Sequence, residues 1–267
     1  IPKMFVMENV PNFITKYNGK IFNQTLKRID QLGYIITNNN VRVLNAADYG
    51  VPQLRKRMIL VAHKKNMSFS YPEPTHYEKE NMLNFGNLKK YVDVYSAISD
   101  LPKITDNWRE SESPYSKNDN LNEYQKIMRR KNRKKTVMNN ICRMTNERAK
   151  KVFSHMKQGD KYMDLPKEIR NILPFREDIF HDRLKKLVNK KPSWTVLAHI
   201  GMDGYMYIHP TENRTLSVRE AARIQSFPDD FVFIGNQMHT YVQVGNAVPV
   251  LLAKAIGHSV LKSLNGK

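Results

Sequence analysis

The stretch KMFVMENVPNF, residues 3–13, is an apolar run that carries a carboxylate, Glu8, and an amide, Asn9, into a proline turn. Its first eight residues have the composition of a buried β-strand. A carboxylate in such a strand is most often an end-of-strand residue that pairs with solvent or with arginine. The alternative is a site residue, held where burial would raise its pKa and let it donate a proton.

The next residues alternate between helical and extended patterns. IFNQTLKRIDQLG, residues 21–33, has helical periodicity, and Gly33 suits the end of that helix. Four apolar residues fall on one helical face: Phe22, Leu26, Ile29 and Leu32. YIITNNNVRVLN (34–45) and RMILVA (57–62) indicate two more strands, separated by the turn-rich NAADYGVPQ. This order of strand, helix and strand favours an α/β fold, with helices packed on an open sheet.

A second ordered region follows residue 191. Ser217 and Glu220 have the spacing of a capping box, which predicts that a helix begins there. Pro249 suits the first turn of a closing helix, VPVLLAKAIGHSVLKSL. Three apolar residues line one face of that helix: Leu252, Ile256 and Val260.

Length and composition exclude several classes of protein. The 267 residues suffice for a full core and leave room for two domains. No stretch approaches the roughly 20 apolar residues of a membrane span, and no signal-peptide pattern is present, so we expect a cytoplasmic protein without a membrane partner. The single cysteine, Cys142, excludes an internal disulfide and argues against a cysteine-based metal site, so no metal is expected.

The charge balance points to a polyanionic partner. The net charge is +19, and each phosphate that Lys or Arg neutralises releases counterions. Nucleic acid is the first candidate, and an anionic membrane surface is the weaker one. Residues 126–151 carry eleven basic side chains and one acidic. Such a run is often only a solvated face, but beside the total charge we expect a surface that contacts phosphates.

The segment YGVPQLRKR, residues 49–57, places three polar side chains on one face of an extended chain, because side chains alternate along a strand. Gln53, Arg55 and Arg57 could each present fork-like donors to carbonyls or phosphates. The alternative is a strand edge at the surface with ordinary charges.

Four blocks occur in one order along the chain: FVMENV (5–10), NAADYGVPQLRKRMILVA (45–62), NRTLSVREAARIQSFPDDF (213–231) and QVGNAVP (243–249). In this order they resemble the sixth, eighth, ninth and tenth conserved motifs of the cytosine-C5 DNA methyltransferases. The resemblance covers residues 1–65 and 192–267, and the middle corresponds to that family's hypervariable recognition region. It implies an α/β fold, with part of a Rossmann-like S-adenosylmethionine-dependent methyltransferase sheet plus a smaller, irregular mixed target-recognition domain.

The resemblance also implies a division into three parts. Residues 1–65 would form the second half of the catalytic domain. Residues 66–213 would form the target-recognition domain, with approximate boundaries. Residues 214–267 would be C-terminal helices that return to the catalytic domain.

Site residues follow from the resemblance position by position. Glu8 is similar to the glutamate that grips the flipped cytosine at N3 and the exocyclic amine, and Arg57 to the arginine that reaches O2. Asn9 would help to hold the geometry of that strand. Arg55 and Gln53 match positions that shape the pocket and the nearby DNA backbone. The implied catalytic residues are Glu8, Arg55 and Arg57, and the implied nucleic-acid contacts include Gln53, Arg55 and Arg57.

Further positions carry over from the later blocks. Asn246, with Ala247 adjacent, resembles the residue beside the carboxylate end of S-adenosyl-L-methionine, the implied cofactor. Thr195 and Val196 resemble the Thr-aliphatic pair that contacts DNA near the flipped base. Three arginines of the ninth block would mainly hold the recognition region against the core: Arg214, Arg219 and Arg223.

The family's chemistry needs groups that this sequence lacks. A cysteine thiolate adds to C6 of a flipped cytosine while the glutamate supports protonation at N3, so that C5 can attack the methyl group. The sequence has no glycine-rich FxGxG loop, no acidic residue after a second strand to hold the ribose, and no Pro-Cys loop. Cys142 lies in the variable basic region without a preceding proline, so we expect a buried or incidental thiol.

The leading hypothesis is therefore the C-terminal portion or a subunit of a DNA (cytosine-5-)-methyltransferase, acting on a specific double-stranded DNA sequence in a restriction–modification system. It would be inactive without an N-terminal half, which is either the rest of a longer chain or a companion catalytic subunit. The opening Ile-Pro-Lys, without an initiator methionine, favours a longer or processed parent.

Two other hypotheses remain. The first is a non-catalytic DNA-binding module derived from such an enzyme, which would bind duplex DNA in a salt-dependent way without methylation. The second is an RNA methyltransferase of the related transfer-RNA type, which the long middle segment disfavours because those relatives have a much smaller recognition region.

Overall fold

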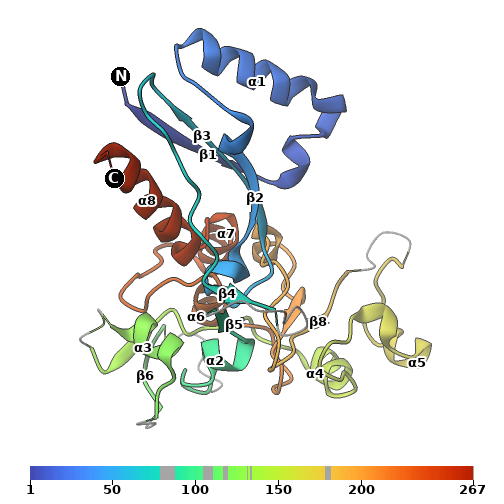
Figure 1. Ribbon diagram of the computed structural model, residues 1–267. Coiled ribbons are helices and arrows are strands. Elements are labelled where there is room, and N and C mark those ends of the chain that lie inside the picture. The colour runs from blue at the N-terminus through green and yellow to red at the C-terminus, as the bar shows by residue number, and fades with distance from the viewer. Residues whose placement is uncertain are drawn as a thin grey trace. The chain divides into compact units, whose positions relative to one another are not determined.

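The computed structural model describes residues 1–78, 88–104, 111–116, 120–130, 132, 134–177 and 182–266 (Figure 1). Packing divides the chain into two compact units. The first unit comprises Ile1–Gly50, Leu54–Tyr91 and Val250–Lys267, and the second comprises Val51–Gln53 and Val92–Pro249.

The boundaries of these two units differ from the boundaries of the predicted domains. The first unit takes α8 (Val250–Leu264) from the last third of the chain, whereas α6 (Val218–Ile224) and α7 (Gln237–Asn246) belong to the second unit. Contacts define the units, and motif resemblance defines the domains. The predicted domain boundaries therefore stay a prediction.

The first unit contains a three-stranded antiparallel sheet in the order β1-β3-β2. Its strands are β1 (Met4–Asn9), β2 (Val41–Asn45) and β3 (Lys56–His63). β3 is the central strand because its run of apolar residues is buried throughout. The predicted strands around β1 and β3 are confirmed. The strand predicted over residues 34–45 is confirmed only at its end, since Asn38–Asn40 form a 3-10 helix.

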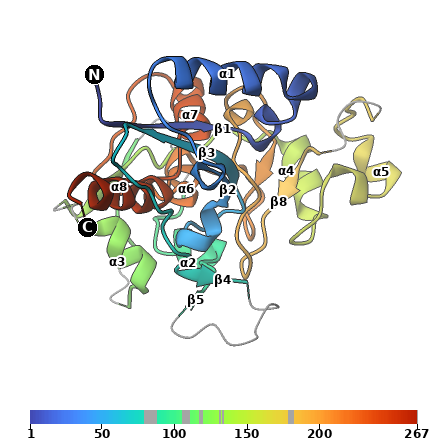
Figure 2. The same cartoon turned by 45° about the horizontal axis from the view of Figure 1, so that its top comes forward.

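Helix α1 (Lys20–Gln31) covers one face of this sheet, as Figure 2 shows. Its apolar side packs against buried residues of β3: Met58, Leu60 and Ala62. The predicted face is confirmed for Phe22, Leu26 and Ile29. Leu32 is a wrong prediction, because it is 53% exposed. It lies beyond the last helical residue, where Gly33, with φ of 72°, turns the chain.

The closing helix α8 completes the first unit. It begins at Val250, so Pro249 directly precedes the helix instead of lying in its first turn. Leu252 and Ile256 are buried as predicted, and Val260 is half-buried. It packs against the 3-10 helix Ala46–Tyr49, and a short parallel pair, β4 (His76–Tyr77) and β5 (Lys89–Lys90), also belongs to this unit. Within the described ranges no single helix is long and apolar enough to cross a membrane, and α7 and α8 meet that requirement only if they are counted as one bent segment.

The second unit consists of short elements joined by irregular chain. Its helices are α2 (Val94–Ile98), α3 (Glu123–Arg129), α4 (Glu147–Ser154), α5 (Lys167–Arg170), α6 and α7. Its strands are β6 (Glu112–Pro114), β7 (Thr136–Met138), β8 (Lys185–Lys186) and β9 (Tyr207–Ile208). β6 and β7 pair antiparallel, and β8 and β9 pair parallel. These short pairs have the irregular, mixed character expected of this part of the chain.

Helix α6 is buried along its whole length. The predicted capping box is confirmed: Ser217 Oγ accepts from Glu220 N at 2.9 Å, and Glu220 Oε2 accepts from Ser217 N at 2.7 Å. The helix also carries Arg219 and Arg223 into the interior, and both side chains are fully buried. Buried charges need polar partners, because their desolvation is otherwise too costly.

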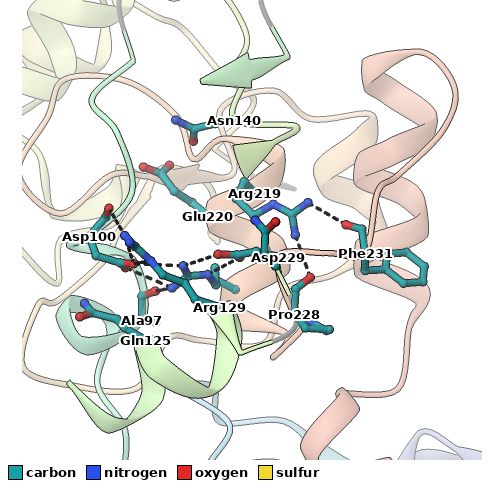
Figure 3. Close-up of polar contacts among 12 residues, drawn as sticks. Ala97, Asp100, Gln125, Arg129, Asn140, Arg219, Glu220, Pro228, Asp229 and Phe231 are labelled. Carbon is teal, nitrogen blue, oxygen red and sulfur yellow. Dashed lines mark hydrogen bonds and ion pairs between the residues drawn. The ribbon is translucent and has the colours of Figure 1, made fainter. Parts of the chain in front are cut away.

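Arg223 forms ion pairs with two carboxylates. Its guanidinium lies 2.6 Å from Asp229 Oδ1 and 3.1 Å from Asp100 Oδ1, and it also donates to Ala97 O at 2.9 Å. Asp100 is shared with Arg129, whose Nη2 lies 2.6 Å from Asp100 Oδ2, and Figure 3 labels Asp100, Arg129 and Asp229 in this cluster. Burial alone lowers the pKa of Arg223, but the two aspartates raise it above its ordinary value.

Arg219 is held differently, by three backbone carbonyls. It donates to Met138 O at 2.8 Å. It also donates to Pro228 O at 3.2 Å and Phe231 O at 2.7 Å (Figure 3). Burial is the main cause of a lowered pKa at Arg219. Arg219 and Arg223 thus connect α6 to residues of the middle segment within the second unit.

Arg214, just before α6, pairs with Glu220. Arg214 Nη2 lies 2.7 Å from Glu220 Oε1, and Arg214 Nε lies 2.8 Å from Glu212 Oε2. Burial alone raises the pKa of Glu220, but the charge and hydrogen bonds of Arg214 outweigh it and lower the pKa to about 2. The carboxylate therefore serves the helix cap and the buried arginine together.

Glu220→Gln should destabilise the chain strongly. The change leaves the buried Arg214 without its main counter-charge, and removing one partner of a buried ion pair costs about 3–5 kcal/mol. The matched control is Glu147→Gln, since Glu147 is 88% exposed in its ion pair with Lys150. That change should cost less than about 0.5 kcal/mol. Urea unfolding at neutral pH measures both, and equal losses would contradict the assigned role of Glu220.

From the lowered pKa of Glu220 we expect the free energy of unfolding to decrease in acid. Its pKa is lowered from an ordinary 4.5 to about 2 on folding, so its contribution is complete above pH 4.5 and is lost as the pH falls towards 2. Glu220→Gln lacks this titration. The difference in free energy of unfolding between wild type and variant should therefore shrink across that window, and a constant difference would refute the prediction.

Candidate functional site

Glu8 and Arg57 form an ion pair on the sheet of the first unit, with Arg57 Nε 2.8 Å from Glu8 Oε1. Glu8 lies opposite Ile59 of β3, so Arg57, two residues earlier on the same face, is its diagonal neighbour. The Arg57 side chain is 10% exposed and that of Glu8 28%. An arginine partner was the ordinary explanation for a carboxylate in this strand. The carboxylate nevertheless remains partly open to solvent.

The surroundings fix both side chains. Burial lowers the pKa of Arg57, and the charge and hydrogen bond of Glu8 act against that shift. Arg57 Nη1 also donates to Lys56 O at 2.8 Å. At the end of β1, Asn9 Oδ1 accepts from Val10 N at 2.8 Å, which orders the start of the proline turn. The pair therefore presents an acceptor and a fork of donors side by side.

Burial alternates along QLRKR as an extended chain requires. Gln53, Arg55 and Arg57 are 0%, 2% and 8% exposed, whereas Leu54 is 41% exposed and Lys56 is exposed. The three polar side chains thus do not form an ordinary charged edge at the surface. In the first unit, Arg55 N donates to Asn45 Oδ1 at 3.2 Å, and the Arg55 carbonyl accepts from Ala46 N at 2.9 Å.

Gln53 lies in the second unit, and its side chain is completely buried. Its Nε2 donates to Ile224 O at 3.2 Å and to Gln225 Oε1 at 3.1 Å, and its Oε1 accepts from Val196 N at 2.8 Å. Both ends of the amide therefore bind protein groups. The predicted contact of Gln53 with nucleic acid stays a prediction, while the structure shows an internal role for this side chain.

Thr195 and Val196 lie beside Gln53 in the second unit. Val196 is fully buried, and Thr195 is half-buried with its carbonyl accepting from Tyr207 Oη at 2.6 Å. The structure thus brings Gln53 and Val196 into direct contact. We did not predict a role for Gln225 from the sequence. There it is only an amide residue that directly follows the apolar positions of the block 213–231.

Asn246 is the last residue of α7, and Ala247 follows it as the C-cap. The Asn246 side chain is exposed and makes no hydrogen bond among the described residues, and Ala247 is half-buried. An exposed amide at a helix end can donate to an anionic group. The predicted contact of Asn246 with the cofactor stays a prediction.

Cys142 is buried, as expected, with 6% exposure. Burial raises the pKa of its thiol to about 11. The thiolate is the nucleophilic form, so this side chain is unreactive near neutral pH. Among the described residues no group of three or more His, Cys, Asp or Glu could hold a metal ion.

Comparison with known proteins identifies the family. A family model described as C-5 cytosine-specific DNA methylase matches residues 1–262. Type II methyltransferase M.Bpa9945I of Bacillus paralicheniformis is 36% identical over 99% of this chain and 61% of its own length. Type II methyltransferase M1.HphI of Haemophilus parahaemolyticus is 35% identical over 98% of this chain and 57% of its own length. A protein of Oceanobacillus iheyensis named as a type II methyltransferase is 34% identical over 98% of this chain and 69% of its own length. The chain thus spans between 57% and 69% of these relatives.

A solved structure shows the same fold. The crystal structure of a DNA modification methyltransferase encoded within an E. coli prophage superposes with a TM-score of 0.72 over 99% of this chain and 70% of that one. At 21% identity this likeness shows the fold alone, and it confirms the expected α/β methyltransferase fold. From the family match over nearly the whole chain, together with relatives more than 30% identical, the chain belongs to the C-5 cytosine-specific DNA methylases.

Proposed function

We propose that this chain is the C-terminal portion or a subunit of a DNA (cytosine-5-)-methyltransferase, which methylates C5 of a flipped cytosine in a specific duplex sequence. An N-terminal half or companion catalytic subunit completes it. The Glu8–Arg57 ion pair carries this proposal, because it is a partly exposed polar pair that joins β1 to the buried central strand β3. The names of the relatives support a role in a restriction–modification system.

The pair is complementary to one edge of cytosine. That edge presents an amine donor, a ring nitrogen and a carbonyl acceptor in a row. Glu8 would accept from the amine and supply a proton to N3, and Arg57 would donate to O2. Their fixed separation of 2.8 Å keeps acceptor and donor adjacent, so that the carboxylate does not have to be reoriented when the base enters. Arg55 would support the same pocket.

The attacking thiolate comes from outside this sequence. The pKa of Cys142 is raised to about 11, so only a minute fraction of it is ionised at neutral pH. The relatives are also longer than this chain, which covers 57% to 69% of them. We infer that an N-terminal half supplies the nucleophile and most of the cofactor pocket.

S-adenosyl-L-methionine, the cofactor of this family, supplies the methyl group. Within this chain, Asn246 would hold its carboxylate end, since its amide is exposed at the end of α7, and Ala247 lies beside it. Thr195 and Val196 would belong to a DNA-contacting segment of the second unit, in which Thr195 is half-buried and Val196 is fully buried. The residues present thus account for one end of the cofactor and one side of the DNA.

A basic surface would bind the duplex backbone. Among the described residues of the stretch 126–151, the exposed basic ones are Lys126, Arg130, Lys134, Lys135, Arg148, Lys150 and Lys151. Arg129 and Arg143 serve the interior instead, since Arg129 binds Asp100 and Arg143 donates to the carbonyl of Gly201. The exposed members supply the sequence-independent part of DNA affinity.

Glu8→Gln should abolish most methyl transfer. Glutamine has nearly the same shape and can still bind the cytosine amine, but it cannot supply a proton to N3, and general acid–base catalysis contributes about 10²–10⁴-fold. The chain would be combined with the N-terminal half encoded upstream or nearby, and methylation would be read by bisulfite sequencing. Glu147→Gln, in an exposed ion pair of the same 2.8 Å length, should leave the rate unchanged.

The outcomes separate the hypotheses. If the wild-type assembly leaves cytosines unmethylated under every complementation while the chain still binds duplex DNA, the non-catalytic binding module is supported instead. If Glu8→Gln methylates at the wild-type rate, the role assigned to Glu8 is wrong. Tighter binding of transfer RNA than of duplex DNA in competition would favour the RNA-modifying alternative.

Replacing Lys134 and Lys135 together by Gln should weaken duplex binding and its dependence on salt. Each lost phosphate contact lowers the slope of log K against log salt by about 0.9. The control pair, Lys20→Gln with Lys27→Gln, removes the same charge from α1, outside the basic stretch. Titration of labelled duplex at several salt concentrations measures both pairs. Equal changes in slope would show that only the total charge matters.

A further inference from the structure

Two buried glutamines form a path of hydrogen bonds inside the second unit. Val196 N donates to Gln53 Oε1 at 2.8 Å, Gln53 Nε2 donates to Gln225 Oε1 at 3.1 Å, and Gln225 Nε2 donates to Val244 O at 2.9 Å. We call this path the glutamine relay. It connects the segment of Thr195 and Val196 with the last turn of α7, which ends at Asn246.

The residues of the relay are fully buried, and its hydrogen bonds all run in one direction from donor to acceptor. Val196, Gln53, Gln225 and Val244 are all 0% exposed. Each amide accepts from one neighbour and donates to the next, so a change at one position leaves a buried polar group without its partner at another. Gln53 Nε2 also donates to Ile224 O at 3.2 Å, which anchors the middle of the relay to the end of α6.

Gly245 brings the same two segments into backbone contact. A Cβ atom at Gly245 would lie 2.4 Å from the Ala198 Cα and N atoms and 2.5 Å from the Leu197 carbonyl carbon. Backbone atoms cannot move aside as the end of a flexible side chain can, so only glycine permits this approach. Leu197 and Ala198 directly follow Val196. The residue before Asn246 therefore rests on the continuation of the Thr195–Val196 segment.

We propose that Gln53, Gln225 and Gly245 are positioning residues that couple cofactor binding at Asn246 to DNA binding at Thr195 and Val196. This inference rests on the proposed function, which gives Asn246 and the Thr195–Val196 pair those two ligands. A ligand that orders the end of α7 also orders the Val196 amide through the relay and through the Gly245 contact. The cofactor then raises the affinity for DNA, and by thermodynamic reciprocity DNA raises the affinity for the cofactor by the same factor. Gln53 acts through Val196 and does not itself touch DNA.

The first experiment needs neither ligand. Amide hydrogen exchange of Val196 would be followed in the chain itself, in Gln225→Leu and in the matched control Gln125→Leu. Gln125 is 2% exposed and also uses its side chain internally, binding Asn122 N and Ser99 Oγ. Gln225→Leu should speed exchange at Val196 about fivefold or more, the effect of losing one net hydrogen bond. Gln125→Leu should leave Val196 unchanged, and an equal effect from both variants would overturn the relay.

A milder variant protects the experiment against unfolding. Gln225→Asn keeps an amide in the core but shortens the side chain, so that it cannot reach Gln53 and Val244 together. It should speed exchange at Val196 as Gln225→Leu does. Unchanged exchange in a folded Gln225→Asn variant would also overturn the relay.

The second experiment measures the coupling. The affinity of a fluorescent duplex for the completed enzyme would be determined by anisotropy with and without S-adenosylhomocysteine, which cannot donate a methyl group. Wild type and Gln125→Leu should bind DNA at least about fivefold more tightly with this ligand, within the usual range of allosteric coupling. Gln225→Leu and Gly245→Ala should bring the ratio to within about twofold of one.

The results separate this inference from the proposed function. A wild-type assembly that methylates DNA but has a ratio of one, or relay variants that keep the wild-type ratio, would overturn the coupling while the enzyme assignment stands. A wild-type assembly that does not methylate DNA would remove the proposed function and the coupling together. The exchange of the Val196 amide would then still decide whether the relay holds that segment.

Discussion

The second unit depends on the pairing of charges that its folding buries. Helix α6 has no exposed residue, yet it carries Glu220, Arg219 and Arg223 into the interior. Water cannot solvate these groups there, so each must be satisfied by fixed protein atoms. The partners come from elsewhere in the unit: Asp100, Asp229, Arg214 and the carbonyls of Met138, Pro228 and Phe231. If one of these partners moved away, a buried charge would lose its counter-charge or hydrogen bonds. The residues around α6 are therefore restricted to essentially one arrangement.

In the first unit a buried arginine is also paired with a carboxylate, but this pair remains partly exposed to solvent. Arg57 is nearly buried, and its partner Glu8 is a diagonal neighbour on the sheet. Here the carboxylate keeps 28% exposure, so the pair is fixed by the strands but still open on one side. An internal pair such as Arg223 with Asp229 has no such opening, since both side chains are 0% exposed. The difference in exposure, more than the chemistry of the groups, separates a pair suited to a ligand from a pair that only holds the fold.

Local patterns in the sequence predicted local structure well. The strand around Glu8, helix α1, the capping box at Ser217 and the helix after Pro249 each follow from neighbouring residues, and the structure contains all of them. Leu32 was misassigned because periodicity does not show where a helix ends. The pairing of Arg223 with Asp100 could not be predicted, because Asp100 lies far away in sequence and in the variable middle segment. Roles at Glu8, Arg57 and Asn246 came from resemblance, since spacing alone cannot distinguish a ligand contact from an ordinary ion pair.

Gln53 is completely buried, and both ends of its amide bind protein groups. Gln53, Gln225 and Val244 come from three separate stretches of the sequence, 45–62, 213–231 and 243–249, and they meet in the fully buried interior of the second unit. A glutamine suits such a junction because it accepts and donates at once, and so can join two backbone groups that a charged or apolar side chain could not. Exposure and hydrogen-bond partners therefore distinguish two kinds of residue. An exposed side chain with free polar atoms can contact a substrate, whereas a buried side chain with internal partners can only position its neighbours. Glu8 is partly exposed and Asn246 is exposed, as the roles proposed for them require, whereas Gln53 is 0% exposed.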